Sequence, residues 1–494
     1  MQDGSSNLPS STKIMVMKKY YYERSNLLES EINIKFEELL WMNKEQTEEW
    51  IENLRSFILS EWDDKGIPPT IGQDTKDIKK NFMKLREYDV HHKFLVRDDS
   101  GNENVIKNYN KHASGVNQFF PTMLKTRVQN GSIYDWFTDE YKDKFQKVIL
   151  RILKRDSMYN WSKCILEGEE MPENFFIVQH KHNAVESKYK TLSVEEVEKL
   201  DVKHRTNLPK ELDGDTYKFL VRDFQLGQKL FPAGIQAFRL GLGQPAVNFP
   251  PLTARYLYEH YTNHIDLDEL EGYTLNIYDP SSGWGGRILG AMSSLKPIHY
   301  IGTDPNTDNW IGELGKSRYE YVADFFNNEV LETNSFWEED KNTYHYFQAG
   351  SELIGNNFEF QSYKGKLDLV FTSPPYFDRE QYSDDEEQSY KAYPEYDDWR
   401  DNFLKPTLTT AYEFLRNDRY LLWNIADIKI GKDKYHPLEQ DSIDIIENLG
   451  GEYQGKLKML MTSMVGVDQS NVKNSVKING TYLKYEPIFI FYKK

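Results

Sequence analysis

The stretch Thr372-Ser373-Pro374-Pro375-Tyr376 places a hydroxyl, a proline carbonyl and an aromatic ring next to one another. It follows residues 367–371, an apolar run that predicts a buried strand. Two consecutive prolines can neither continue a sheet nor open an ordinary helical turn, so the chain should leave this strand as a stiff, exposed loop. Such groups suit an enzyme that acts on a planar amine, because the oxygens can accept the amine hydrogens while the ring stacks on the flat group. The alternative is a strand that simply ends in a Pro-Pro turn.

A second loop, residues 279–287, has the sequence Asp-Pro-Ser-Ser-Gly-Trp-Gly-Gly-Arg and follows another apolar run. Its three glycines would let the backbone approach a ligand closely. The spacing matches neither the dinucleotide fingerprint nor a phosphate-binding loop. The next expected strand ends at Asp304, where a carboxylate can hold the hydroxyls of a ribose. The pair predicts a site for a nucleoside without phosphates, such as S-adenosylmethionine (SAM); a tight strand-to-helix turn is the alternative.

The elements that must position these loops alternate between strand and helix from about residue 216 onward, which predicts an α/β fold with a mostly parallel sheet covered on both faces. In such a sheet the ligand lies at the carboxyl ends of the strands. We expect a mainly helical domain over residues 1–215, with a helix near 43–62 capped by Asn43, and a catalytic domain over 216–494. The expected strands are Thr274–Tyr278, Ile298–Gly302, Tyr344–Phe347, Leu367–Thr372, Tyr420–Ile425, Lys458–Met461 and Pro487–Phe491.

The bulk composition indicates a globular protein of two or more domains, with 494 residues, 39% hydrophobic and 28% charged. No apolar run is long enough to span a membrane, and the polar N-terminus lacks the core of a signal peptide. The single Cys164 excludes an internal disulfide and a cysteine-based zinc cluster, which fits a cytoplasmic location. The net charge of −17 arises within residues 251–400, where 28 acidic residues face 11 basic ones. This balance argues against loose, charge-driven binding of nucleic acid but not against a specific contact.

Taken together, the glycine loop, Asp304 and the Ser-Pro-Pro-Tyr loop resemble the amino-group DNA methyltransferases, in particular phage and bacterial modification methylases. The resemblance covers about residues 216–494 and implies a Rossmann-like class I methyltransferase core with a seven-stranded, mostly parallel sheet. Three further segments are similar to the family: residues 248–251, 350–352 and 485–491. A departure is Asn417-Asp418, where the family often has a Pro-Gly-Gly turn.

The resemblance implies transfer of a methyl group from SAM to the exocyclic amine of a base turned out of double-stranded DNA. Asp279 would lie near the methionine amine, Asp304 would hold the ribose, and Tyr376 would stack on the base. The implied catalytic residues are Ser373, Pro374, Pro375 and Tyr376. The implied cofactor-binding residues are Asp279, Ser281, Gly283, Trp284, Gly285, Gly286, Asp304, Ser351, Glu352, Phe249 and Pro250.

The choice between N4 of cytosine and N6 of adenine stays open, although a leading serine leans toward cytosine among relatives. Methylation of carbon 5 is set aside because it needs a thiolate, and Cys164 lies outside both loops. Other planar amines, such as an RNA base or a protein glutamine, remain alternatives, as does a non-catalytic interaction protein with this fold. We expect no metal, and a cognate restriction endonuclease is a possible partner.

DNA recognition falls by elimination to residues 1–215, because the catalytic part has little room for a separate reading domain. A mix of cations and aromatics there includes Lys125, Arg127, Phe119 and Phe120, and such a mix can contact phosphates and stack on bases. An ordinary solvated face is the alternative. The acidic segment 378–390 just past the catalytic loop is expected to be either a flap over the extruded base or a plain solvated loop.

Overall fold

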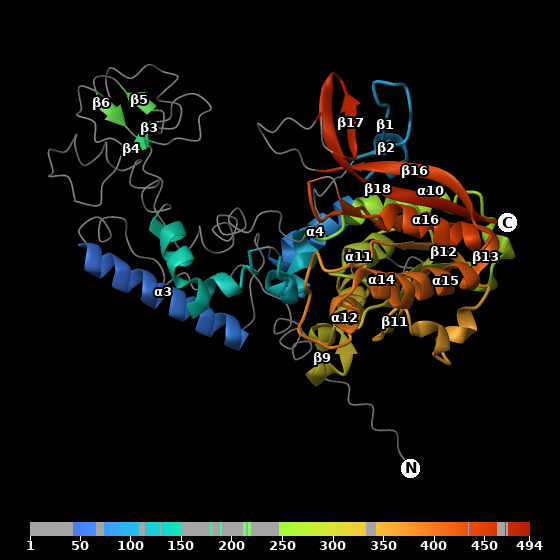
Figure 1. Ribbon diagram of the computed structural model, residues 1–494, viewed down its shortest axis with the longest axis horizontal. Coiled ribbons are helices and arrows are strands. Elements are labelled where there is room, and N and C mark those ends of the chain that lie inside the picture. Colours follow the sequence, from blue (N-terminus) through green and yellow to red (C-terminus); the bar gives the residue numbers. More distant parts are fainter. Residues whose placement is uncertain are drawn as a thin grey trace, which may run out of the picture. The chain divides into compact units, whose positions relative to one another are not determined.

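The computed structural model describes residues 43–65, 74–107, 114–128, 130–150, 247–331, 342–432, 434–461 and 473–494, together with residue 470 and four short strands. The chain divides into two compact units (Figure 1). The first comprises Met1–Glu23, Gln73–Gln129 and Ala246–Lys494, and the second comprises Arg24–Gly72 and Asn130–Pro245. This division differs from the expected boundary at residue 215, because it places residues 73–129 in the same unit as the glycine loop and the Ser-Pro-Pro-Tyr loop. Cys164 lies outside the described residues.

A mostly parallel sheet forms the centre of the first unit. Its strands run in the order β11-β8-β7-β12-β13-β18-β16, and only β18 is antiparallel to its neighbours in this series. The chain adds strands outward in both directions from the β7–β12 pair, so the order reverses there. Ligands of such α/β sheets bind at this switch point, beyond the carboxyl ends of the strands. The bounds are β7 Leu275–Asp279, β8 Ile298–Thr303, β11 Thr343–Phe347, β12 Leu367–Thr372, β13 Leu415–Asn424, β16 Glu452–Leu460 and β18 Thr481–Lys493.

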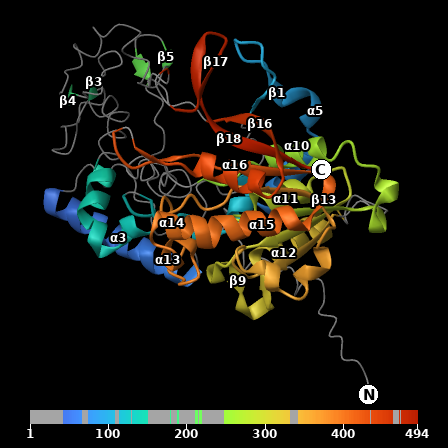
Figure 2. The same cartoon turned by 45° about the vertical axis from the view of Figure 1, so that its right-hand side comes forward.

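All seven expected strands are present at the expected places. β12 has the expected bounds, whereas β13, β16 and β18 are longer than their apolar runs suggest. Most of the extra residues are half-exposed or exposed, as in the first four positions of β18, whereas Leu415, Leu457 and Tyr485 are buried. The first four positions of β18 pair with β17 Ser475–Ile478 as a hairpin that rises from the sheet (Figure 2). Hydrophobic periodicity detects the buried part of a strand and not such extensions.

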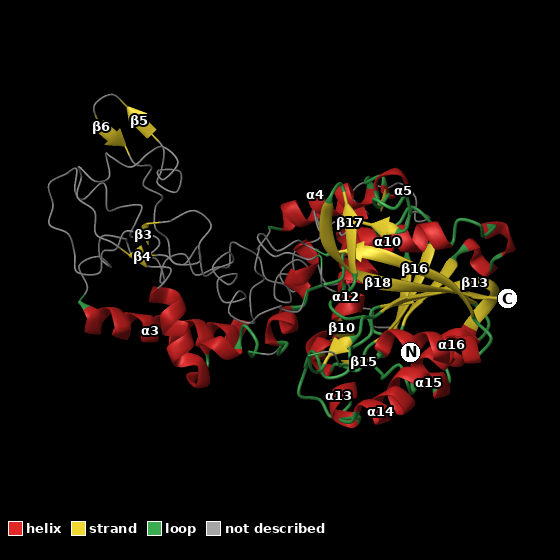
Figure 3. Ribbon diagram, turned by 45° about the horizontal axis from the view of Figure 1, so that its top comes forward, coloured by secondary structure: helices red, strands yellow, loops and turns green. Residues whose placement is uncertain are grey.

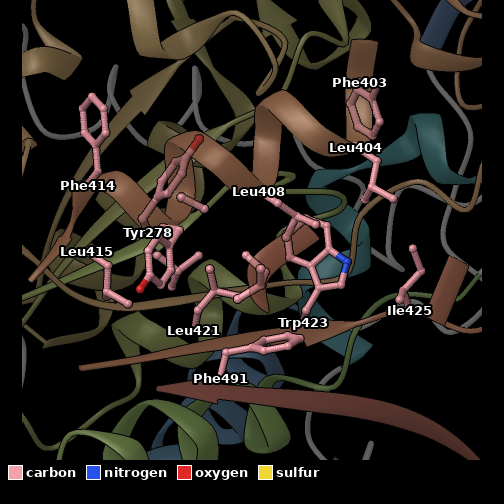
Figure 4. Close-up of a cluster of buried hydrophobic side chains, with 14 of the residues drawn as sticks. Tyr278, Phe403, Leu404, Leu408, Phe414, Leu415, Leu421, Trp423, Ile425 and Phe491 are labelled. Atoms are coloured by element: carbon pink, nitrogen blue, oxygen red, sulfur yellow. The ribbon is translucent and has the colours of Figure 1, made fainter. Parts of the chain in front are cut away.

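Helices cover both faces of the sheet (Figure 3). One layer holds α10 Pro251–Tyr261, α11 Gly286–Met292 and α12 Arg318–Asp324, and the other holds α13 Ser389–Ala392, α14 Tyr396–Trp399, the π-helical η15 Arg400–Leu404, α15 Lys405–Phe414 and α16 Leu438–Asn448. Between the second layer and the sheet lies a large apolar core (Figure 4), in which Leu421 and Trp423 of β13 lie among Leu408 of α15 and Phe491 of β18. This core fixes the end of β13 beside the Ser-Pro-Pro-Tyr loop.

Residues before the catalytic part also belong to this unit. They form α4 Thr75–Arg86, α5 Val90–Lys93, β1 Leu95–Val96, β2 Val105–Ile106, and the 3₁₀ turns η2 Ser114–Phe119 and η3 Pro121–Lys125. β2 extends the sheet by pairing in parallel with β16. The buried Arg255 of α10 donates to the carbonyl oxygens of Leu85 and Arg86 at 2.6 and 2.8 Å, and it pairs with Glu259 at 2.8 Å. The C-terminal end of α4 is thereby held on α10.

The second unit contains α3 Lys44–Lys65 and a helical stretch at 142–150. Asn43 caps α3 as expected, since its side chain accepts from the backbone N–H of Gln46 at 2.9 Å. The buried Arg55 donates to the Phe137 carbonyl at 2.6 Å and pairs with Glu52. The short strands of the second unit are β3 Val178–Gln179, β4 Lys188–Tyr189, β5 Glu211–Asp213 and β6 Thr216–Lys218. Within the described residues, no helix combines the length and the apolar character needed to cross a membrane.

The contact between α10 and α11 requires a glycine. A Cβ atom on Gly290 would lie 2.7 Å from the Pro251 carbonyl oxygen and 2.8 Å from the Ala254 Cβ. We expect Gly290→Ala to lower the free energy of unfolding by about 1–3 kcal/mol, because backbone and helix must shift to admit the methyl group. Gly312→Ala is the control, since a Cβ there meets nothing within 4 Å. Thermal melts of both variants test this; equal melting temperatures would contradict the close packing.

Candidate active site

The loops with candidate catalytic and ligand-binding groups meet at one edge of the sheet. Asp279 at the end of β7 pairs in register with Gly302 of β8, and Thr303 of β8 pairs with Phe347 at the end of β11. The end of β12 joins them, because the Thr372 hydroxyl donates to Asp279 Oδ1 at 2.6 Å. The glycine loop, Asp304 and the Ser-Pro-Pro-Tyr loop therefore start from adjacent strand ends, as the sequence predicted.

Asp279 is fully buried and its carboxylate is fully engaged. Oδ2 accepts from Arg287 Nε at 2.7 Å and from the Tyr300 hydroxyl at 2.6 Å. Oδ1 accepts from Thr372 and from the backbone N–H of Ser281, the latter at 3.2 Å. These four donors occupy the lone pairs that two carboxylate oxygens offer. The structure thus shows Asp279 positioning the strand end and the turn, and its expected contact with a methionine amine stays a prediction.

Arg287 is the buried counter-charge of Asp279. Burial disfavours its charge, but the carboxylate of Asp279 and the nearby Tyr300 outweigh that effect and raise the Arg287 pKa above its ordinary value. Arg287 also donates to the carbonyl oxygen of Ser281. One guanidinium therefore ties the strand end to the turn that follows it.

The glycines of the turn differ in purpose. Gly283 and Gly285 have φ values of +61° and +75°, which favour glycine. A Cβ on Gly285 would lie 2.3 Å from the Phe120 ring, and one on Gly286 would lie 2.0 Å from the Phe249 carbonyl oxygen. At Gly283 the nearest atom would be Arg287 Nη2 at 3.4 Å. Gly285 and Gly286 are thus packed against the protein itself, and Gly283 is the glycine with room for a ligand.

The segment Asn248-Phe249-Pro250 lies across this turn. Asn248 Oδ1 accepts from the backbone N–H of Gly286 at 3.1 Å, and its Nδ2 donates to the Trp284 carbonyl at 2.6 Å. The Phe249 ring packs edge-on against Phe371 of β12, with centroids 5.2 Å apart. Pro250 is buried and caps α10. Asn248 was not among the predicted residues, although it stands in the same Asn-Phe-Pro-Pro motif.

Asp304 lies just after β8 and is only half-buried. Oδ2 accepts from the Gly283 N–H and Oδ1 accepts from the Asn306 N–H, both at 3.0 Å. Burial raises the pKa of Asp304 to about 6, against the lowering effect of these backbone donors. Each oxygen keeps a lone pair, so the carboxylate can still accept from two hydroxyls of a ribose.

The turn after β11 supplies a second acidic group. Ser351 is buried, and its hydroxyl lies 3.0 Å from the Thr407 hydroxyl of α15, so its side chain serves packing. Glu352 is half-buried, and burial raises its pKa. A Cβ on Gly350 would lie 2.6 Å from Glu352 Oε2, so the glycine leaves room for that carboxylate. An open glycine, Asp304 and Glu352 fit a ligand with hydroxyl and amino groups, as SAM has.

The Ser-Pro-Pro-Tyr loop is held at its end. The Tyr376 hydroxyl donates to the Asn424 carbonyl at 3.3 Å, which fixes the half-buried ring beside β13. The next residue, Phe377, has φ of +48°, a strained value for a bulky side chain. Its buried ring packs against Trp399 and His436, with centroids 5.8 and 5.4 Å away. Core packing thus holds the backbone at the end of the loop in this conformation.

Two further carboxyl groups lie near this loop and were not predicted. Burial raises the pKa values of Glu380 and Glu486, and each charge acts on Tyr376. Glu380 Oε2 accepts from the Tyr382 hydroxyl at 2.6 Å, and the Tyr382 ring lies 5.4 Å from the ring of Trp284. A carboxylate with a raised pKa is a stronger base, and so a better proton acceptor, than an exposed carboxylate. Glu380 stands in no recognisable motif, and Glu486 lies in the segment 485–491, whose resemblance did not single it out as a site residue. Their place beside Tyr376 therefore becomes evident only in the fold.

The four predicted DNA-contact residues have different surroundings. Phe119 and Phe120 are fully buried. The ring centroid of Phe119 lies 5.1 Å from that of Phe325, and the centroid of Phe120 lies 5.1 Å from that of Tyr319. Their expected role in base stacking is therefore wrong, since these rings pack in the core. Lys125 and Arg127 are exposed, as a DNA contact requires.

The acidic segment 378–390 is tied to its surroundings at two points. Arg127 and Gln381 exchange backbone hydrogen bonds of 2.9 and 3.0 Å. Asp385 accepts from the backbone N–H of Thr307 at 2.8 Å. The segment is thus ordered beside the site rather than a plain solvated loop. In the described part of the chain, no three His, Cys, Asp or Glu side chains are grouped as a metal site would need.

Comparison with known proteins gives no family model and no curated protein that matches this chain. Among solved structures, a Thermus thermophilus protein provisionally assigned as a DNA modification methylase, in complex with SAM, has 16% identity and a TM-score of 0.21. That match covers 29% of this chain and 53% of the other. TrmN of Thermus thermophilus has 14% identity and a TM-score of 0.25, with 49% of each chain covered.

A Listeria monocytogenes protein provisionally assigned as a class I SAM-dependent methyltransferase has 13% identity and a TM-score of 0.29. The match covers 55% of this chain and 76% of that one. The alignments with the two Thermus proteins span only about half of their lengths. Because all three TM-scores lie below 0.5, the function proposed below rests on the geometry of the site.

The Asp279–Arg287 pair makes a stability prediction. We expect Arg287→Met to lower the free energy of unfolding by about 3–5 kcal/mol, because it leaves a carboxylate buried without its counter-charge. Adding Asp279→Asn to that variant should recover part of the loss. Arg400→Met is the control, since its pairs with Asp397 and Asp401 are partly exposed and should contribute less than about 1 kcal/mol. Urea unfolding measures all three; equal losses for Arg287 and Arg400 would contradict this role of the pair.

Proposed function

We propose that this chain methylates the exocyclic amine of a cytosine or adenine in double-stranded DNA, with SAM as the methyl donor. The observation that carries the proposal is the meeting of three groups at the switch point of the sheet. The Ser-Pro-Pro-Tyr loop after β12 stands beside the glycine turn after β7, and Asp304 after β8 bonds directly to that turn. An amine-binding loop and a nucleoside-binding turn thus share one edge.

In this proposal the donor is held by the open side of Gly283 and by Asp304 and Glu352. When bound, SAM supplies a methyl group on a positively charged sulfur, which is already activated for transfer. The protein then has to position the amine, and much of the rate enhancement can come from positioning.

The amine of a base is a weak nucleophile because its lone pair is delocalised into the ring. The Ser373 hydroxyl and the Pro374 carbonyl can accept its two hydrogens, which favours a lone pair localised on nitrogen. The Tyr376 ring, fixed through Asn424, offers a flat face for a base that has left the duplex. Glu380 and Glu486 stand near enough to act on Tyr376 electrostatically and suit the uptake of the released proton.

The class of substrate is tested at the level of the base. The full chain is incubated with SAM and mixed-sequence duplex DNA, and the DNA is digested to nucleosides for mass spectrometry. We expect N4-methylcytosine or N6-methyladenine. Parallel reactions with RNA and with glutamine-containing peptides serve as controls. Methylation of those substrates alone, or of none despite SAM binding, would refute the proposal.

Substitutions at Tyr376 distinguish stacking on the target base from binding of the methyl donor. We expect Tyr376→Ala to reduce methyl transfer by roughly 5- to 150-fold, which corresponds to the about 1–3 kcal/mol of base stacking. Tyr376→Phe keeps the ring and should retain most activity. SAM affinity, measured by calorimetry, should stay within about threefold in both variants. Loss of SAM binding in Tyr376→Ala would mean that the loop belongs to the donor site.

Asp304 predicts a pH dependence of SAM affinity. Its ionised form accepts the ribose hydroxyls, and burial raises its pKa to about 6, so protonation removes this acceptor below about pH 6. We expect affinity to be constant above pH 7 and to fall roughly tenfold by pH 5. Asp304→Asn should bind more weakly and lose this dependence. An identical pH profile in that variant would exclude Asp304 as the titrating group.

A further inference from the structure

A short hairpin follows the end of β13, directly beyond the residue that holds Tyr376. It consists of β14 Ile428–Lys429 and β15 Tyr435–His436, joined by residues 430–434. Ile428 pairs with His436 and Lys429 with Tyr435, and the Ile430 N–H donates to the Lys434 carbonyl at 2.9 Å. We call residues 428–436 the basic hairpin; Figure 3 labels its second strand, β15.

The base of the basic hairpin is fixed to the catalytic loop. Ile428 is buried in the large core, at 7% exposure. His436 stacks on Tyr396 of α14 with ring centroids 4.2 Å apart, and it contacts the edge of Phe377. Phe377 directly follows Tyr376. The hairpin is therefore held in place by the same aromatic contacts that hold the end of the Ser-Pro-Pro-Tyr loop.

The tip of the basic hairpin is exposed and positively charged, in contrast to its buried base. Lys429, Lys432 and Lys434 are exposed, and the apolar Ile430 between them is 54% exposed. In sequence the hairpin has three lysines and one aspartate, within a chain of net charge −17. Among the described residues near the hairpin, Lys456 pairs with Glu439 and Lys473 pairs with Asp427.

We propose that the basic hairpin docks on duplex DNA beside the target base, with its lysines on phosphates and Ile430 inserted where the base leaves the stack. This inference rests on the proposed function and adds a contact surface to it. Lysine side chains neutralise phosphates, and apolar side chains inserted at a base step stabilise an opened duplex. A cationic tip with an exposed isoleucine combines both properties, and its rigid base is in contact with the catalytic loop.

A duplex is favoured as the occupant over a single strand. A single strand needs no wedge, because its bases are already free to enter a site, whereas a paired base must be replaced in the stack. The acidic residues 384–387 lie in the segment after the catalytic loop and repel phosphate, so the duplex must be held from another side. The hairpin supplies positive charge for that contact.

The phosphate contact is tested by the salt dependence of DNA binding. The dissociation constant of the full chain for a duplex is measured at several salt concentrations, in the presence of the demethylated SAM product. The K429Q/K434Q variant should bind several-fold more weakly at low salt, and its log-affinity slope should be reduced by about 2. The control K364Q/K366Q removes two lysines that precede β12 and pair with Glu413 and Glu271. It should behave as wild type, and equal slopes for both variants would overturn the proposal.

The proposed insertion of Ile430 as a wedge in the duplex is tested with one substitution and two substrates. Ile430→Ala should reduce methylation of a fully paired duplex by tenfold or more. It should have little effect on a duplex whose target base faces an abasic site, because that base is not held by pairing. Equal loss on both substrates would overturn the wedge.

The outcomes separate this inference from the proposed function. Normal DNA methylation by the hairpin variants refutes the hairpin contact and leaves the function intact. If the wild-type chain does not methylate DNA, the proposed function is refuted. The salt dependence of DNA affinity still shows whether the hairpin lysines contact phosphates. SAM affinity should be unchanged in every hairpin variant, and thermal melts verify that each is folded.

Discussion

The site depends on one buried carboxylate. Asp279 accepts from Arg287 of the glycine turn, Tyr300 of β8 and Thr372 of β12, so it joins three neighbouring strands. A carboxylate in this position is stable only because every lone pair is satisfied and a guanidinium balances its charge. The glycine turn and the catalytic loop are thereby held at a fixed distance from each other. A site that works by positioning two reactants needs such a fixed distance.

Asp279 and Asp304 show how the same residue type takes different roles one strand apart. Asp279 has no exposed surface and no spare acceptor, whereas Asp304 keeps a lone pair on each oxygen and has a pKa raised to about 6. The sequence could indicate that both lie at strand ends, and both were expected to face the donor. Which one is free depends on Arg287, whose side chain turns back to Asp279 after the glycines. Three-dimensional packing therefore decides which aspartate keeps free acceptors, and the spacing of residues in the sequence does not indicate it.

Local features of the sequence were therefore sufficient for the buried parts of the seven central strands, for their carboxyl edge and for the two loops. They failed where distant segments meet. The glycines at 285 and 286 suggested room for a ligand, but Phe120 and the Phe249 carbonyl fill that room. Phe119 and Phe120 suggested a surface for bases, yet they are buried in the core of the first unit. Residues 73–129 pack on a sheet whose first central strand begins at Leu275, and no local pattern encodes a contact across such a separation.

The distribution of charge gives the final constraint on how a nucleic acid could approach. The acidic residues are concentrated in 251–400, which includes the glycine turn, Asp304 and the segment 378–390. A small cationic donor benefits from this field, since it lowers the cost of placing a positive sulfur there. A phosphate backbone is repelled by the same field and must be held by cations outside it. Exposed lysines on the hairpin that follows Asn424 meet this requirement, because they lie beyond the acidic stretch in sequence. The hairpin itself is next to the Ser-Pro-Pro-Tyr loop, since its His436 contacts Phe377 directly after that loop.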